Sequence, residues 1–140
     1  MNHIRVVFVA LTLTVIASSP AMAQETPPAT DTVTGKAELV KVMSKALLQM
    51  ASAQEVFYSK HMRYAGEIDV LSAFEPVPDV TVRLVTMHPN FQGYAAEATH
   101  PALEGRNCVI FIGAEGTPGI ATKREQKSNG MGRVACDSAM

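Results

Sequence analysis

Residues 36–63 form the longest unbroken periodic stretch of this sequence, and they constrain the fold more than any other feature. The stretch contains neither proline nor glycine, and residues that favour helix make up most of it. Apolar residues recur along it at steps of three and four, which indicates an amphipathic helix. This apolar stripe consists of Leu39, Val40, Met43, Ala46, Leu47, Met50, Ala53, Val56 and Phe57. At about 1.5 Å per residue, the sequence predicts one long helix of about 40 Å.

The segment that follows predicts the end of this helix and an extended connector. Residues 64–66 (Tyr-Ala-Gly) end the helical pattern, and Gly66 is expected to take the left-handed conformation that commonly terminates helices. Apolar residues within 68–71 predict a short turn or helix. Two prolines within 74–78 then predict an extended chain, because each removes a backbone donor and restrains the residue before it.

Beyond the connector the apolar period changes from helical to alternating, which predicts strands. Residues 80–87 (VTVRLVTM) form a β-branched strand with one face toward solvent. Residues 88–91 (His-Pro-Asn-Phe) predict a turn, followed by a strand over 93–99. Residues 107–113 are apolar on both faces and predict a central strand, and a short fourth strand is expected near 120–124. The chain is therefore predicted to be α+β, with one long N-terminal helix packed on a three- to four-stranded antiparallel sheet.

The N-terminus follows the pattern of a secretory signal. Arg5 supplies a positive start, residues 6–17 are mostly apolar and uncharged, and residues 21–23 (Ala-Met-Ala) suit signal peptidase. Twelve apolar residues would span only about 18 Å, whereas a hydrocarbon core is about 30 Å thick. We therefore expect residues 1–23 to be a signal peptide cleaved near Ala23, with an uncleaved membrane anchor as the alternative.

Cleavage would leave a spacer and one domain. Residues 24–35 are rich in Pro, Thr and small polar residues, which predicts a disordered spacer. Residues 36–140 then form a single globular domain, periplasmic or secreted and not membrane-spanning. The whole chain has 12 basic and 13 acidic residues, and Arg5 is the only charged residue that cleavage removes. This near-neutral balance gives no strong nucleic-acid signal.

The two cysteines, Cys108 and Cys136, form an even pair in a chain predicted to be exported, where a disulfide is the default. They are not spaced as CxxC and have no histidine ligands nearby, so a metal site is not expected. By chain-entropy reasoning, the loop that the bond closes would stabilise the fold by about 3–4 kcal/mol.

The histidines give little support for catalysis. His61 follows Phe57 on the helical stripe and is expected to pack there. His88 and His100 each precede a proline in a turn, without a carboxylate or cysteine at ligand spacing. We therefore expect no enzyme, metal or cofactor, unless the fold gathers His88, His100 and a carboxylate in one cleft.

Charged residues of the C-terminal region form two further groups. The acidic residues Glu115, Glu125 and Asp137 lack the alternating pattern of a calcium loop, so a solvated loop is expected for them. A basic cluster is a candidate interaction surface, although charge runs are usually solvated faces. It consists of Lys123, Arg124, Lys127 and Arg133.

Several strings, in their order along the chain, resemble the globular domain of type IV pilins and type II secretion pseudopilins. They are residues 51–58 (ASAQEVFY), 63–65 (RYA), Leu71, 80–82 (VTV), 93–100 (GYAAEATH) and the cysteine pair. The resemblance covers about residues 36–137. It implies a pilin-like fold with a disulfide-closed C-terminal loop. It also implies a non-enzymatic protein that binds proteins of the cell envelope, such as components of a pilus or a type II secretion machine.

The N-terminus departs from the pilin pattern. Pilin precursors carry a short basic leader ending in glycine, and their long apolar helix has a glutamate five residues after the cut. Here the apolar run ends in Ala-Met-Ala, which favours a soluble pilin-like domain over a filament subunit. The alternative is a stand-alone periplasmic domain that binds a small ligand or acts as an inhibitor.

Overall fold

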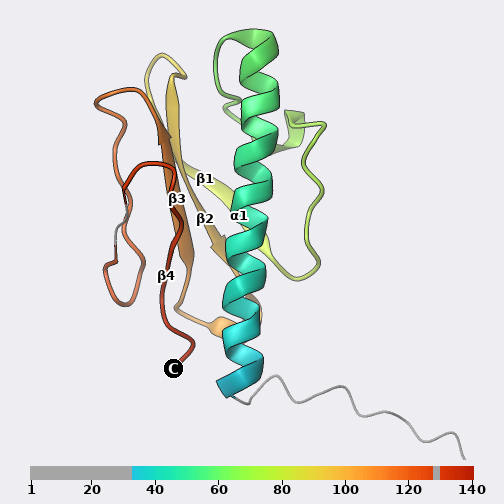
Figure 1. Ribbon diagram of the computed structural model, residues 1–140, viewed down its shortest axis with the longest axis vertical. Coiled ribbons are helices and arrows are strands. Elements are labelled where there is room, and N and C mark those ends of the chain that lie inside the picture. Colours follow the sequence, from blue (N-terminus) through green and yellow to red (C-terminus); the bar gives the residue numbers. More distant parts are fainter. Residues whose placement is uncertain (1–32, 128–129) are drawn as a thin grey trace, which may run out of the picture.

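The structure, a computed structural model, describes residues 33–127 and 130–140. The predicted signal peptide and most of the predicted spacer lie outside these residues. One helix packs against a four-stranded antiparallel sheet in the order β1-β2-β3-β4 (Figure 1). The elements are α1 (Val33–His61), β1 (Thr81–Met87), β2 (Gly93–Thr99), β3 (Cys108–Gly113) and β4 (Ala135–Cys136), with short 3-10 turns at Ile68–Val70 and Pro101–Leu103. The predicted α+β fold class is confirmed.

Helix α1 follows the predicted period but differs at its ends. It begins at Val33, three residues before the predicted start, and it ends at His61. Met62 takes the left-handed conformation with φ 56°, in the role that was predicted for Gly66. The chain turns this early because the Met62 N–H closes a last turn on the carbonyl oxygen of Tyr58 at 2.8 Å. Two residues later, the Tyr64 N–H donates to the carbonyl oxygen of Phe91 at 2.8 Å, which joins the connector to the turn between β1 and β2.

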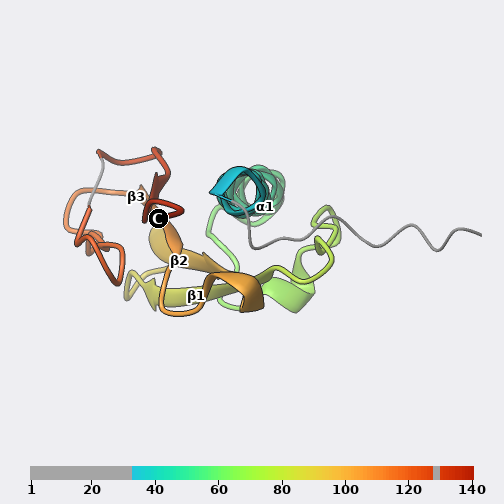
Figure 2. The same ribbon diagram turned by 90° about the horizontal axis from the view of Figure 1, so that it is seen from below.

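The apolar stripe of α1 faces the sheet, with one exception. Met43, Ala46 and Met50 are fully buried, whereas Val56 keeps 44% of its surface exposed although the pattern placed it on the stripe. On the facing side of β2, Ala96 and Ala98 are fully buried. Their small side chains allow the helix to lie close over the middle of the sheet, as the end-on view shows (Figure 2).

A buried amide attaches the connector to the helix. Gln54 is fully buried; its Nε2 donates to the carbonyl oxygen of Ala65 at 3.0 Å, and its Oε1 accepts from the Ala65 N–H at 2.8 Å. Next to it, the Tyr64 hydroxyl donates to Glu55 Oε1 at 2.9 Å. Residues 53–55 and 63–65, which were separate strings in the sequence, therefore bind each other in the fold.

The strands agree with the prediction except for the last one. The turn at 88–91 closes through a Phe91 N–H bond to the His88 carbonyl oxygen at 2.8 Å, and β3 lies inside the sheet, as expected. The fourth strand forms at Ala135–Cys136, so the prediction near 120–124 was wrong. That segment bonds instead to side chains: the Lys123 N–H donates to Asn107 Oδ1, and the Arg124 N–H donates to Asp137. Within the described residues, no helix is both long and apolar enough to cross a bilayer.

Candidate functional site

The C-terminal loop, residues 114–127 and 130–134, is closed by the predicted disulfide. Cys108 and Cys136 are bonded, with their Cα atoms 4.0 Å apart. They lie directly opposite each other in the β3–β4 pair. Because β4 has only two residues, the bond carries much of the attachment between the last strand and the sheet. Disulfides of this kind persist in oxidising compartments outside the cytoplasm.

A buried carboxylate next to the disulfide organises the loop. Asp137 is only 1% exposed, so the expectation that it is solvated was wrong. Its Oδ1 accepts from the Glu125 N–H at 2.7 Å, and its Oδ2 accepts from the N–H groups of Arg124 and Asn107, both at 3.2 Å. A single side chain thus joins the loop, the start of β3 and the end of β4.

A second buried carboxylate, Glu97 on β2, lies on the sheet face opposite the helix. It is 3% exposed and bonds three residues from different segments. Arg83 Nε donates to Oε1 at 2.5 Å, and Asn107 Nδ2 donates to Oε2 at 2.7 Å. Lys123 Nζ lies 3.3 Å from Oε2. Glu97 therefore holds the C-terminal loop against the sheet.

Both carboxylates stay ionised despite their burial. Burial opposes the charge of Glu97, but hydrogen bonds from Asn107, Arg83 and Lys123 outweigh it and lower the pKa below its usual value. Burial likewise opposes the charge of Asp137, and bonds from Thr122 and three backbone N–H groups lower its pKa.

These shifts predict that the fold loses stability in acid. A carboxylate with a lowered pKa stabilises the folded state above its unfolded pKa, and this contribution disappears as the pH falls through the folded value. The melting temperature should therefore fall as the pH drops below about 4. The melting temperature of the double variant Glu97→Gln, Asp137→Asn should fall less steeply with pH than that of the wild type. Circular dichroism melts from pH 7 to pH 3 would measure both. The exposed Glu104→Gln serves as the control, and an unchanged slope in the double variant would contradict the assignment.

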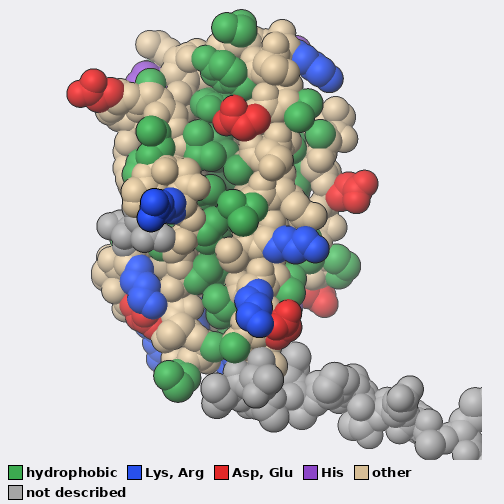
Figure 3. Space-filling view, viewed as in Figure 1, with side chains coloured by type: hydrophobic (Ala, Val, Ile, Leu, Met, Phe, Trp, Pro, Cys, Tyr) green, Lys and Arg blue, Asp and Glu red, His purple; other side chains and the backbone are tan. Residues whose placement is uncertain are grey.

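The predicted basic cluster is exposed, but half of it is already paired. Lys123 pairs with Glu97, and Lys127 pairs with Glu125 and donates to the carbonyl oxygen of Cys136 at 3.3 Å. Together with Ser138, Lys127 lowers the pKa of Glu125 to about 2. The side chains of Arg124 and Arg133 are exposed. Basic side chains lie over the C-terminal loop and also along α1 (Figure 3), and acidic partners offset the charge of two of the four residues.

The structure does not bring the predicted histidines together. His88 follows β1 and His100 follows β2, so the antiparallel pairing puts them at opposite ends of the two strands. Each ring caps its own turn: Nδ1 of His88 accepts from the Asn90 N–H at 3.3 Å, and Nδ1 of His100 accepts from the Ala102 N–H at 3.1 Å. Within residues 33–127 and 130–140, no group of three or more potential ligands could hold a metal ion.

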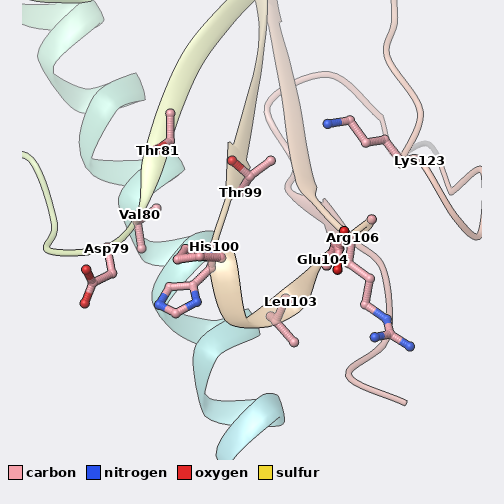
Figure 4. A pocket seen from close by; sticks show the side chains of 11 residues that line it. Asp79, Val80, Thr81, Thr99, His100, Leu103, Glu104, Arg106 and Lys123 are labelled. Atoms are coloured by element: carbon pink, nitrogen blue, oxygen red, sulfur yellow. The ribbon is translucent and has the colours of Figure 1, made fainter.

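His100 lines a pocket of about 540 Å³ between the ends of β1, β2 and the loop. Its charged lining residues do not converge. In Figure 4 the His100 ring points toward Asp79, Arg106 points away from it, and Lys123 comes from a separate segment. Arg106 bonds the backbone oxygen of Met140 and so holds the tail of the chain.

A second pocket, of about 530 Å³, lies at the His61 end of α1. Tyr58, Tyr64 and Gln92 line one side, and Ile112 and Met131 belong to the β3 and C-terminal loop side. Residues 113, 114 and 132 complete the lining. We call this the tyrosine pocket. It lies along the seam between α1 and the β3 side of the sheet, where apolar side chains form a column on the face shown in Figure 3.

The residues that line the tyrosine pocket are uncharged, and its aromatic rings contact one another. The Tyr58 and Tyr64 ring centroids lie 4.8 Å apart with the rings tilted by 39°, and Tyr64 meets Tyr94 edge-on at 5.1 Å. The Tyr58 hydroxyl donates to Gln92 Oε1 at 3.0 Å. Burial raises the pKa of both Tyr64 and Tyr94, so their hydroxyls stay neutral at physiological pH. The Tyr94 hydroxyl is buried and has no hydrogen-bond partner among the described residues.

A separate apolar patch lies where α1 meets the connector. Val56 and Val70 share the lining of one small hollow with Phe57, and the two valines are 44% and 52% exposed. We call these three residues the connector patch. The sequence pattern missed it, because Val56 fitted the buried stripe and Val70 fitted a packed turn.

None of the protein families, curated proteins or solved structures with which the chain was compared matches it.

Proposed function

We propose that this protein is an exported, non-enzymatic pilin-like domain that binds other proteins of the cell envelope, with pilus or type II secretion components as its partner class. The observation that carries the proposal is the arrangement of its parts. A long N-terminal helix lies on a four-stranded antiparallel sheet, and the C-terminal loop is closed by the Cys108–Cys136 disulfide. This is the arrangement that the resemblance to pilins implies.

The contacts between the resembling strings add support. Residues 53–55 and 63–65 are joined by the Gln54–Ala65 bonds and by the Tyr64–Glu55 bond. These hydrogen bonds fix the turn from the helix to the connector. Because one fold can host many functions, they support the pilin-like fold rather than any particular partner.

The connector patch supports protein binding. Exposed apolar side chains that lie together on a surface favour contact with another apolar surface, whereas singly scattered ones are normal. Val56 and Val70 come from different elements and share one hollow beside Phe57. Lys60 and His61 line the same hollow and give it a polar rim, as protein interfaces have.

Crosslinking in cells followed by affinity purification tests the proposal. We expect envelope proteins of a pilus or secretion machine to be recovered with the wild-type protein. The variant Val56→Glu, Val70→Glu should lose them, because two charges would replace the apolar contact. Met140→Glu is the matched control, since Met140 is 81% exposed and lies outside the patch. Recovery of no envelope protein, or equal recovery by the patch variant, would count against the proposal.

A further inference from the structure

The tyrosine pocket has the chemistry of a site for an uncharged, extended peptide. Its side chains are two tyrosines, a glutamine, an isoleucine, an alanine and a methionine, and it has no charged lining residue among those described. Grooves lined by aromatic rings bind proline-rich segments, because the proline ring packs flat on an aromatic face and the extended backbone costs little entropy to order. Met131 is 60% exposed and can adapt to the shape of an occupant.

The chain itself carries such a segment. Residues 24–32 read QETPPATDT, with Pro27 and Pro28 flanked by uncharged threonine and alanine. The two acidic residues, Glu25 and Asp31, stand near the ends of the segment. The centre of the segment therefore matches the neutral lining of the pocket.

Chain length prevents this segment from reaching the pocket of its own molecule. Tyr58 lies 25 residues along α1 from Val33, which is about 38 Å at the helical rise. Pro27 precedes Val33 by six residues, and six residues span at most about 22 Å when fully extended. Only the pocket of another copy is within reach.

We propose that the Pro27-Pro28 segment of one copy binds the tyrosine pocket of a second copy. This inference goes beyond the proposed binding of envelope proteins, because it uses a surface other than the connector patch and names one partner, another molecule of this chain. The segment precedes the start of α1 and the pocket lies at the other end of the helix, so the contact is head-to-tail. Such a contact joins two different surfaces, so a pair of copies keeps one free segment and one free pocket. Further copies can bind there and form an open chain, or the free segment and the free pocket can bind each other and close a ring.

Tyrosine fluorescence reports on this site directly. The protein has three tyrosines and no tryptophan, and all three belong to one cluster of contacting rings, Tyr58, Tyr64 and Tyr94. A synthetic peptide of residues 24–32 contains no aromatic residue and adds no signal. Adding it to the purified full chain should give a saturable change in emission. The same peptide with both prolines replaced by alanine should bind at least about tenfold more weakly.

Variants of the tyrosine pocket test whether the change in emission comes from peptide bound at this pocket. Tyr58→Ala and Met131→Ala should each weaken peptide binding about tenfold. Met131 is largely exposed, so its variant should fold even if Tyr58→Ala does not. Met140→Ala should bind as the wild type does. Equal binding of the two peptides, or no emission change with either, would overturn the proposal. A response to a neutral disaccharide such as cellobiose but not to the peptide would also overturn it, in favour of a small-ligand site.

Sedimentation of the full chain tests the head-to-tail contact. We expect oligomers whose size grows with concentration and which dissociate when the peptide of residues 24–32 is added. The variant Pro27→Ala, Pro28→Ala should remain monomeric, and a wild type that is monomeric at every concentration would overturn the contact. If the protein does not oligomerise, the proposal that the connector patch binds envelope proteins still stands. The two experiments therefore test the two proposals separately.

Discussion

Replacing Cys108 and Cys136 together by serine should lower the free energy of unfolding by about 2–5 kcal/mol. The bond joins the two residues directly across the β3–β4 pair, and the ladder of β4 is short, with Val109–Ala135 as its other pair. The C-terminal loop is largely polar and exposed, so without the bond it has little burial to offset its chain entropy. Urea denaturation followed by circular dichroism would measure the change.

In the cysteine double variant, the C-terminal loop should unfold before the helix and the inner strands do. Hydrogen exchange of the double variant should show faster exchange in residues 120–137 while amides of β2 keep their protection. Alkylation of the native protein with and without reductant checks that the bond is present in the exported form. Two free thiols in that material, or a double variant as stable as the wild type, would refute the prediction.

Removing the Asp137 carboxylate should lower the free energy of unfolding about as much as removing the disulfide. Asp137→Ala leaves three backbone N–H groups, those of Asn107, Arg124 and Glu125, without their acceptor. An unpaired buried donor costs about 1–3 kcal/mol. The Asn107 N–H bond is buried, whereas those of Arg124 and Glu125 are part-buried, so water recovers part of their cost. We expect a loss of about 3–5 kcal/mol in the free energy of unfolding.

Two comparisons make the Asp137 experiment specific. Glu115→Ala removes an exposed acidic residue from the same loop and should change stability by less than about 0.5 kcal/mol. Asp137→Asn keeps one oxygen acceptor and should fall between the alanine variant and the wild type. Equal stability of the Asp137→Ala and Glu115→Ala variants, measured by thermal and urea melts, would contradict a clamping role for Asp137.

Periodicity predicted the elements whose side chains alternate between core and solvent. The stripe through Met43, Ala46 and Met50 specified the helix, and the alternation at 80–87 specified the first strand, because burial dictates both patterns. The disulfide followed from an even pair of cysteines in a chain predicted to be exported. The turn at 88–91 followed from the local conformational preferences of Pro89 and Asn90.

The parts that the sequence did not predict depend on long-range polar contacts. Glu97, Asn107 and Asp137 are buried because partners from distant segments bond them, and no local pattern marks such partners. Residues 120–124 carry strand-like residues, yet their backbone bonds to these side chains, and the short strand forms at 135–136. The pattern did not mark Gln54 either: it lies outside the apolar stripe, yet it is fully buried, and its amide bonds the backbone of Ala65.

The order of the strands also sets an order of assembly. Strands β1, β2 and β3 follow one another in sequence and pair with their nearest neighbours, so they close short loops. Strand β4 pairs with β3 across a separation of 28 residues, and its two residues contribute few ladder bonds of their own. During refolding, the hairpins should therefore precede the arrival of β4. The correct register holds the thiols of Cys108 and Cys136 directly opposite each other, so we expect oxidation to accelerate at this final step of folding rather than at the first collapse.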